Sequence, residues 1–188
     1  MFIYLTWVDP SMALKQTSSP IVISTRFNQG VAEAFETLPV DLQLNPLDQE
    51  VFVVTAVKID FDNLPTSTAA PNTVVQASFE VAVSKSRPTA IESIGNSNCI
   101  AASEVITLTA HDGTAQPLAV SVYENSPMDS PPSQLEYLDI IATDNFFIGL
   151  DGDNTSSVAN GSVRLFGYRA KADAATYAAL VQSEMLSQ

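Results

Sequence analysis

The chain has 188 residues, and its 21 Asp and Glu outnumber its 8 Lys and Arg to give a formal net charge of −13, although only 15% of residues are charged. A surface of this sign repels phosphate, so neither direct nucleic-acid binding nor adhesion to an anionic membrane is expected. The single cysteine, Cys99, excludes an intrachain disulfide and a cysteine-rich zinc site. The length suits one domain, and we expect residues 1–188 to form a single core.

The first 48 residues are expected to supply strands or an arm. Residues 2–8 alternate in hydrophobicity and end at Asp9-Pro10, which predicts a strand, because the charged start of a signal peptide is missing. A short strand is predicted over residues 21–27. Apolar residues alternate again from 38 to 44, where Pro39 favours an edge strand. No run approaches the ~20 apolar residues of a transmembrane helix.

The sandwich core is expected between residues 49 and 169. Its most apolar stretch is Glu50–Phe61, EVFVVTAVKIDF, the longest unbroken run of strand-forming residues. Strict alternation would place Val51 and Val53 on the same face as Val57, and Phe52 and Val54 on the other. We expect the start of this strand to be buried on both faces. The opposing sheet would cover one face, and the N-terminal segment, a C-terminal helix or a neighbouring subunit the other.

The remaining core pattern consists of short strands separated by Pro, Gly and Asn. One of them has an apolar and a polar face, which indicates an antiparallel sheet with one solvated side. At least eight strands without βαβ alternation predict an all-β fold, an antiparallel two-sheet β-sandwich of jelly-roll type. These further strands are predicted over residues 73–84, 104–110, 117–123, 137–142, 146–150 and 162–168.

From residue 170 the hydrophobic period changes from 2 to 3.6, which predicts a C-terminal α-helix over residues 170–188. Small side chains on its apolar face allow close packing. That face could dock on the chain's own sandwich or contact a neighbouring subunit, and the sequence leaves both open. The predicted subunit contacts are Ala174, Tyr177, Ala178, Val181 and Met185.

Few side chains suggest chemistry. The single histidine, His111, lies in a predicted hairpin turn beside Asp112, where a solvated turn residue is expected rather than a general base. Asp144, Asp151 and Asp153 surround a Gly-containing loop and are the candidate ligands of a Ca²⁺ ion, although the EF-hand pattern is not met. The structural alternative is a polar turn between strands.

A pair of carboxylates could also serve glycoside hydrolysis, drawn from Glu80, Glu104, Glu124 or Glu136, but the sequence does not select two of them. No nucleotide-binding loop or nucleophile motif occurs. We therefore expect no enzyme activity and no cofactor apart from the possible calcium.

In strand number and spacing, the chain resembles the single jelly-roll capsid proteins of small icosahedral viruses. The resemblance implies a structural protein of the virion that packs with copies of itself, and with other capsid proteins, into a shell. Many such proteins carry a basic arm that packages the genome. This chain has none, so it is expected to lie away from nucleic acid. The alternative is an extracellular, Ca²⁺-dependent carbohydrate-binding or adhesion module.

Overall fold

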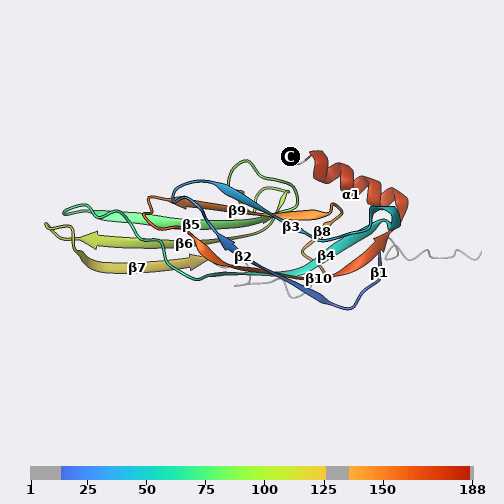
Figure 1. Cartoon of the computed structure of the whole chain (residues 1–188), viewed down its shortest axis with the longest axis horizontal. Coiled ribbons are helices and arrows are strands. Elements are labelled where there is room, and N and C mark those ends of the chain that lie inside the picture. The colour runs from blue at the N-terminus through green and yellow to red at the C-terminus, as the bar shows by residue number, and fades with distance from the viewer. Residues whose placement is uncertain (1–13, 126–135, 187–188) are drawn as a thin grey trace, which may run out of the picture.

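The computed structural model describes residues 14–125 and 136–186; the strand predicted over residues 2–8 lies outside these ranges. The described chain forms two antiparallel five-stranded sheets and one C-terminal helix, so the predicted all-β sandwich is confirmed (Figure 1). Sheet A contains β1 (Leu14–Gln16), β2 (Ile21–Asn28), β4 (Glu50–Phe61), β8 (Asp139–Ile141) and β10 (Asn160–Ala172), and sheet B contains β3 (Glu36–Asp41), β5 (Val74–Ser84), β6 (Cys99–His111), β7 (Pro117–Asn125) and β9 (Asn145–Asp153).

The strand pairing follows the winding of a jelly roll. β2 pairs with β10, β3 with β9 and β4 with β8, and β5 and β6 close the series as a neighbouring pair. The chain is therefore a long two-stranded ribbon whose successive pairs lie alternately in sheet A and sheet B. Contacts of β10 with β4 and of β9 with β5 join the pairs within each sheet. β1 and β7 are additions to the eight strands of a jelly roll.

β4 has the predicted bounds but not the predicted faces. Phe166 pairs with Ala56 and Gly167 with Val54, so Thr55 is an extra, bulged residue. Its Oγ1 donates a hydrogen bond of 3.1 Å to the Phe166 carbonyl. A bulge reverses the alternation along a strand, and strict alternation through residues 50–61 is therefore wrong. The side chains of β4 that face the inter-sheet core are Phe52, Val54, Val57, Ile59 and Phe61.

Three phenylalanine rings pack together in the core between the two sheets. The Phe61 ring meets Phe27 of β2 edge-on at a centroid distance of 6.0 Å and stacks on Phe79 of β5 at 6.4 Å. These three rings join both sheets, and aromatic pairs of this geometry add stability beyond the area they bury.

The C-terminal helix, α1 (Ala174–Leu186), begins four residues later than predicted. Residues 170–172 continue β10 instead, since Ala170 pairs with Val51 and Ala172 with Leu14. Asp173 then caps the helix and accepts hydrogen bonds from the backbone N–H groups of Ala175 at 3.0 Å and Thr176 at 2.8 Å. These bonds, that of Thr176 first, hold the pKa of the Asp173 carboxyl below its usual range.

Helix α1 covers the outer face of sheet A at the end of the molecule opposite the β6–β7 turn (Figure 1). Tyr177, Leu180 and Val181 pack against the second core, which contains the buried side chains of Val51 and Val53. Of the three alternatives for the second face of β4, the chain's own helix is therefore the cover. The helix docks on its own sandwich.

A buried carboxylate anchors the far end of α1. The Glu184 side chain accepts hydrogen bonds from the backbone N–H groups of Ala142 at 2.7 Å and Thr143 at 3.1 Å, just beyond β8. Burial raises the pKa of Glu184 more than these bonds lower it.

We expect Gly167→Ala to lower the free energy of unfolding by about 3 kcal/mol, as overpacking does in a tight core. A Cβ at Gly167 would lie 2.2 Å from the Val53 carbonyl oxygen and 2.6 Å from the Phe52 ring. Gly113→Ala is the control, because its nearest neighbour, Asn72, would be 3.6 Å away. Urea unfolding of both variants measures the difference. Equal losses would contradict the close packing at the bulge.

We also expect Glu184 to make stability depend on pH. Because burial raises its pKa in the folded protein, its stabilising contribution is complete below the ordinary value of 4.5 and is lost as the pH rises through the folded pKa. The free energy of unfolding of the wild type, relative to Glu184→Gln, should therefore fall between about pH 4 and pH 7. Denaturant titrations across this range measure it, and a constant difference would contradict the burial of the charge.

Candidate functional site

The three predicted calcium ligands do not form one site. Asp144 directly precedes β9, whereas Asp151 and Asp153 lie among the last three residues of that strand. Asp144 and Asp151 are seven residue steps apart along the extended chain of β9, a distance of ~23 Å. Residues 151–153 are also strand rather than polar turn, because β9 runs on to Asp153 beside β5. Among residues 14–125 and 136–186, no three His, Cys, Asp or Glu side chains are grouped to hold a metal ion.

His111 is not a solvated turn residue. It is the last residue of β6, it is buried, and its backbone N–H donates a hydrogen bond of 2.8 Å to the Thr73 carbonyl. The Asp112 carboxylate instead accepts hydrogen bonds from the backbone N–H groups of Thr114 at 2.7 Å and Gln116 at 2.9 Å. Asp112 thus shapes the turn and does not hydrogen-bond the imidazole as a catalytic partner would.

The outer face of sheet B carries a row of polar residues across four strands. Asp151 of β9 lies directly opposite Glu80 of β5, Glu80 opposite Glu104 of β6, and Glu104 opposite Asn125 of β7. Side chains in such positions have Cβ atoms ~5 Å apart. Three carboxylates are therefore direct neighbours in a row, a juxtaposition that costs stability when all are ionised.

Two of the four glutamates considered for hydrolysis are thus brought together, namely Glu80 and Glu104. Glu124 pairs with Val105, whose side chain faces the core, so it lies on the other face of sheet B. Glu136 is exposed and lies outside the strands. Glu80 and Glu104 are neighbours because of the register of β5 against β6. A single sequence does not reveal the register between two strands.

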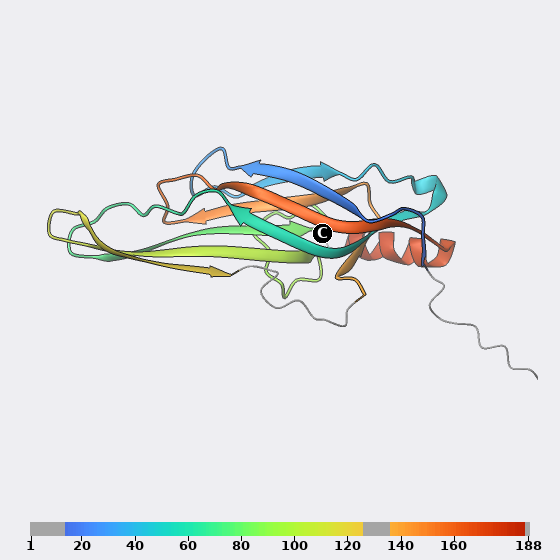
Figure 2. The ribbon, with the colours of Figure 1, turned by 90° about the horizontal axis from the view of Figure 1, so that it is seen from below.

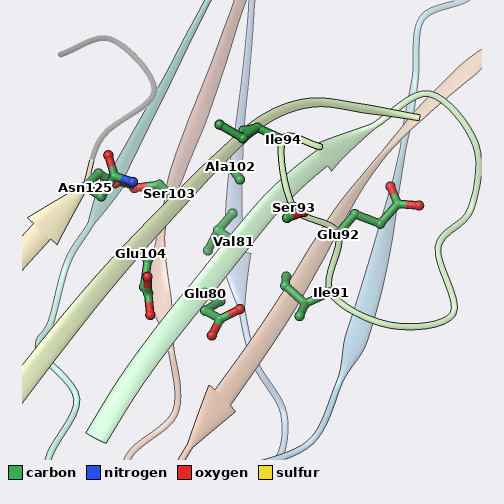
Figure 3. A pocket seen from close by; sticks show the side chains of 10 residues that line it. All are labelled: Glu80, Val81, Ile91, Glu92, Ser93, Ile94, Ala102, Ser103, Glu104 and Asn125. Atoms are coloured by element: carbon green, nitrogen blue, oxygen red, sulfur yellow. Dashed lines mark hydrogen bonds between the residues drawn. The ribbon is translucent and has the colours of Figure 1, made fainter. Parts of the chain in front are cut away.

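A pocket of about 230 Å³ lies over Glu80 and Glu104 (Figure 3). The segment between β5 and β6 folds back to form one wall, with Ile91 and Ile94 above the strands. Glu92 from the same segment holds the wall in place: its carboxylate accepts hydrogen bonds from Ser84 Oγ at 2.5 Å and Asn98 Nδ2 at 2.8 Å. The full lining is Glu80, Val81, Ile91, Glu92, Ser93, Ile94, Ala102, Ser103, Glu104 and Asn125.

The Glu80 carboxyl in this pocket holds its proton more tightly than an exposed glutamate does. Burial, and then the charges of Glu104, Asp151 and Asp153, raise the pKa of Glu80. Many glycoside hydrolases use a carboxylic acid whose pKa is raised in this way and that lies near a second carboxyl group. Among the described residues, no aromatic side chain lines this pocket to stack against a sugar ring. The chemistry supported by this pocket is proton binding at Glu80.

A second candidate site is the free edge of sheet B, formed by β7. All nine of its residues are exposed. Of the fifteen exposed large apolar side chains among the described residues, six gather on this end of β5, β6 and β7. We call this group the edge patch; it consists of Val74, Leu108, Leu118, Val120, Val122 and Tyr123.

The edge patch spans both faces of sheet B. Leu108 and Tyr123 lie on the outer face, and Val120 and Val122 lie on the inner face, where they are uncovered because sheet A and its connections end before β7. Thr107 of β6 is buried and its Oγ1 donates a hydrogen bond of 2.8 Å to the carbonyl of Pro65, in the segment between β4 and β5. Val122 lies directly opposite Thr107 on β7, yet 51% of it is exposed. Figures 1 and 2 show the end of sheet B with the β6–β7 turn reaching beyond sheet A.

The residues predicted for subunit contact divide between two sides of α1. Tyr177 and Val181 pack on the chain's own sheet A. Ala174, Ala178 and Met185 are exposed. The sequence prediction missed the edge patch, although its signal is the apolar run of residues 117–123 with no basic residue.

No known protein family and no curated protein matches the sequence. None of the helical segments within the described ranges has the length and hydrophobicity that a membrane span requires.

We expect Glu80→Gln to stabilise the protein at neutral pH. Because the pKa of Glu80 is raised on folding, its contribution is complete below 4.5 and is lost as the pH rises. Removing the charge should raise the melting temperature at pH 7 by about 1 to 3 °C, since like charges opposite each other cost about 0.2–1 kcal/mol.

The control is Glu124→Gln, which removes an exposed carboxylate from the other face of the sheet. Thermal melts of both variants at about pH 4 and pH 7 measure the effect. A gain that is the same at both pH values, or that Glu124→Gln reproduces, would contradict the carboxyl pair.

Proposed function

We propose that this protein is a structural subunit that assembles with copies of itself into a closed shell, as a virus capsid or coat protein of the virion. The observation that carries the proposal is the edge patch, most of which lies on β7, a strand whose outer side pairs with none of the other described strands. Open apolar edges of this kind are prone to pair with other chains, and soluble monomers protect them.

The fold supports the proposal in a general way. Jelly rolls occur in viral capsid proteins and in lectins. The fold is therefore consistent with proteins that bind or assemble through their surfaces, but it does not distinguish a capsid protein from a lectin. Closed shells need repeated contacts between identical subunits, and symmetric homo-oligomers are the common outcome.

The distribution of charge supports partners other than nucleic acid. The net charge of −13 comes with 8 Lys and Arg in 188 residues, which leaves few groups to neutralise phosphate. Other capsid proteins remain possible partners in the proposed shell, since protein surfaces need no such neutralisation. In this proposal the chain lies away from the genome.

The alternative, a calcium-dependent carbohydrate-binding or adhesion module, rested on Asp144, Asp151 and Asp153. The distance along β9 between the first and the other two removes that support. The described lining of the pocket over Glu80 contains no aromatic side chain that could stack on a sugar. No observation favours this alternative over assembly.

The size of the purified protein over a range of concentrations tests the proposal. We expect mass photometry and negative-stain electron microscopy to find large particles of regular size in equilibrium with small oligomers. A protein that stays monomeric at every concentration, and whose melting temperature rises with Ca²⁺ and falls with a chelator, would overturn the proposal in favour of the module.

A further inference from the structure

The outer edge of β7 has the backbone groups that another strand could use. β7 forms its ladder with β6 on one side, and among the described strands none pairs with its other side. Natural edge strands are protected by lysine, proline, bulges or short length. β7 is nine residues long, its one proline is the first residue, and its one register shift with β6 lies beside that proline.

Charge favours a second copy of the chain as the occupant of this edge. A molecule with a net charge of −13 repels its own copies over most of its surface. Residues 105–123, which form most of β6, the turn and most of β7, contain one acidic residue, Asp112, and no Lys or Arg. Two copies thus meet here with little repulsion, and a cationic partner finds little to attract it.

We propose that two copies pair through β7 as antiparallel strands, about a two-fold axis at Ser121, so that two five-stranded sheets B become one ten-stranded sheet. This inference rests on the proposed function of self-assembly and names the contact that it uses. A two-fold contact of this kind is self-complementary, because every residue pair occurs twice.

The register follows from the side chains of β7. With Ser121 at the centre, Val120 lies opposite Val122 of the second copy on one face, and Ala119 lies opposite its Tyr123 on the other, a small side chain facing a large one. The two Glu124 residues are then ~20 Å apart, about two and a half Debye lengths at physiological salt. Parallel pairing in register would place them side by side, where like charges destabilise a sheet.

The area of the contact indicates a reversible dimer. β7 is ~30 Å long, and a strip of this length with side chains on both faces covers roughly 600 Å² of each copy, against ~800 Å² in a standard interface. The pair is therefore expected to form and dissociate with concentration. A shell would need further contacts elsewhere on the subunit.

Disulfide trapping tests the register. In a Cys99→Ser background, Ser121→Cys should form covalent dimers under mild oxidation at least about tenfold faster than Ser24→Cys, because the two-fold axis holds its thiols together. Ser24 is a matched control, since it is an exposed serine on β2, which is also an edge strand. Both exchanges are close in size, so the folded protein should tolerate them.

A charge in the contact tests its contribution to association. Val122→Lys should weaken the dimer by at least about tenfold, measured by sedimentation equilibrium. Val22→Lys is the control, because Val22 on β2 is 53% exposed, nearly the same as the 51% of Val122, and it gains the same charge. Circular dichroism of both variants checks that the sandwich is intact.

The outcomes separate this inference from the proposed function. Large assemblies that survive Val122→Lys, together with no trapping at Ser121→Cys, would overturn the β7 contact and leave the shell proposal standing. Monomers at every concentration would overturn both. Loss of association on deleting residues 1–13, again without trapping at Ser121→Cys, would assign the edge to the N-terminal segment and overturn pairing between two copies of β7.

Discussion

The packing of the whole molecule depends on the β-bulge at Thr55 in β4. The extra residue reverses the side-chain alternation, so the strand buries Phe52, Val54, Val57 and Ile59 between the sheets and Val51 and Val53 on the opposite side. Two buried faces at one end of a strand require two covers. Sheet B is one cover, and α1, capped by Asp173 and anchored by Glu184, is the other.

This arrangement decides which surfaces are left for a partner. Tyr177 and Val181 of α1 pack inside the monomer, so only Ala174, Ala178 and Met185 of the five residues predicted for subunit contact are exposed. At the opposite end, β7 is added to the jelly roll without a matching strand in sheet A. Six of the fifteen exposed large apolar side chains among the described residues therefore gather at the β7 end of sheet B. Exposure of this kind is costly in a monomer and favourable in an assembly.

The sequence predicted what depends on local pattern. Alternation identified β4 at its true bounds and β5 within one residue, and Pro39 correctly marked β3 as an edge strand. Features set by pairing between distant segments could not be read this way. The bulge depends on the register of β4 against Gly167, and the Glu80–Glu104 pair on that of β5 against β6. Ala170 and Ala172 would fit a helix as well as a strand. They extend β10 because Ala170 pairs with β4 and Ala172 pairs with β1.

The central claim is that the free edge of β7 is the surface through which copies of the chain meet. Amide hydrogen exchange at low and high protein concentration tests it most directly, because pairing protects backbone N–H groups on the edge that is joined. The account predicts that protection increases in residues 117–125 as the concentration rises, while residues 21–28 of β2, an edge strand of sheet A, stay unchanged. Protection gained at β2 or α1, with none at β7, would contradict it.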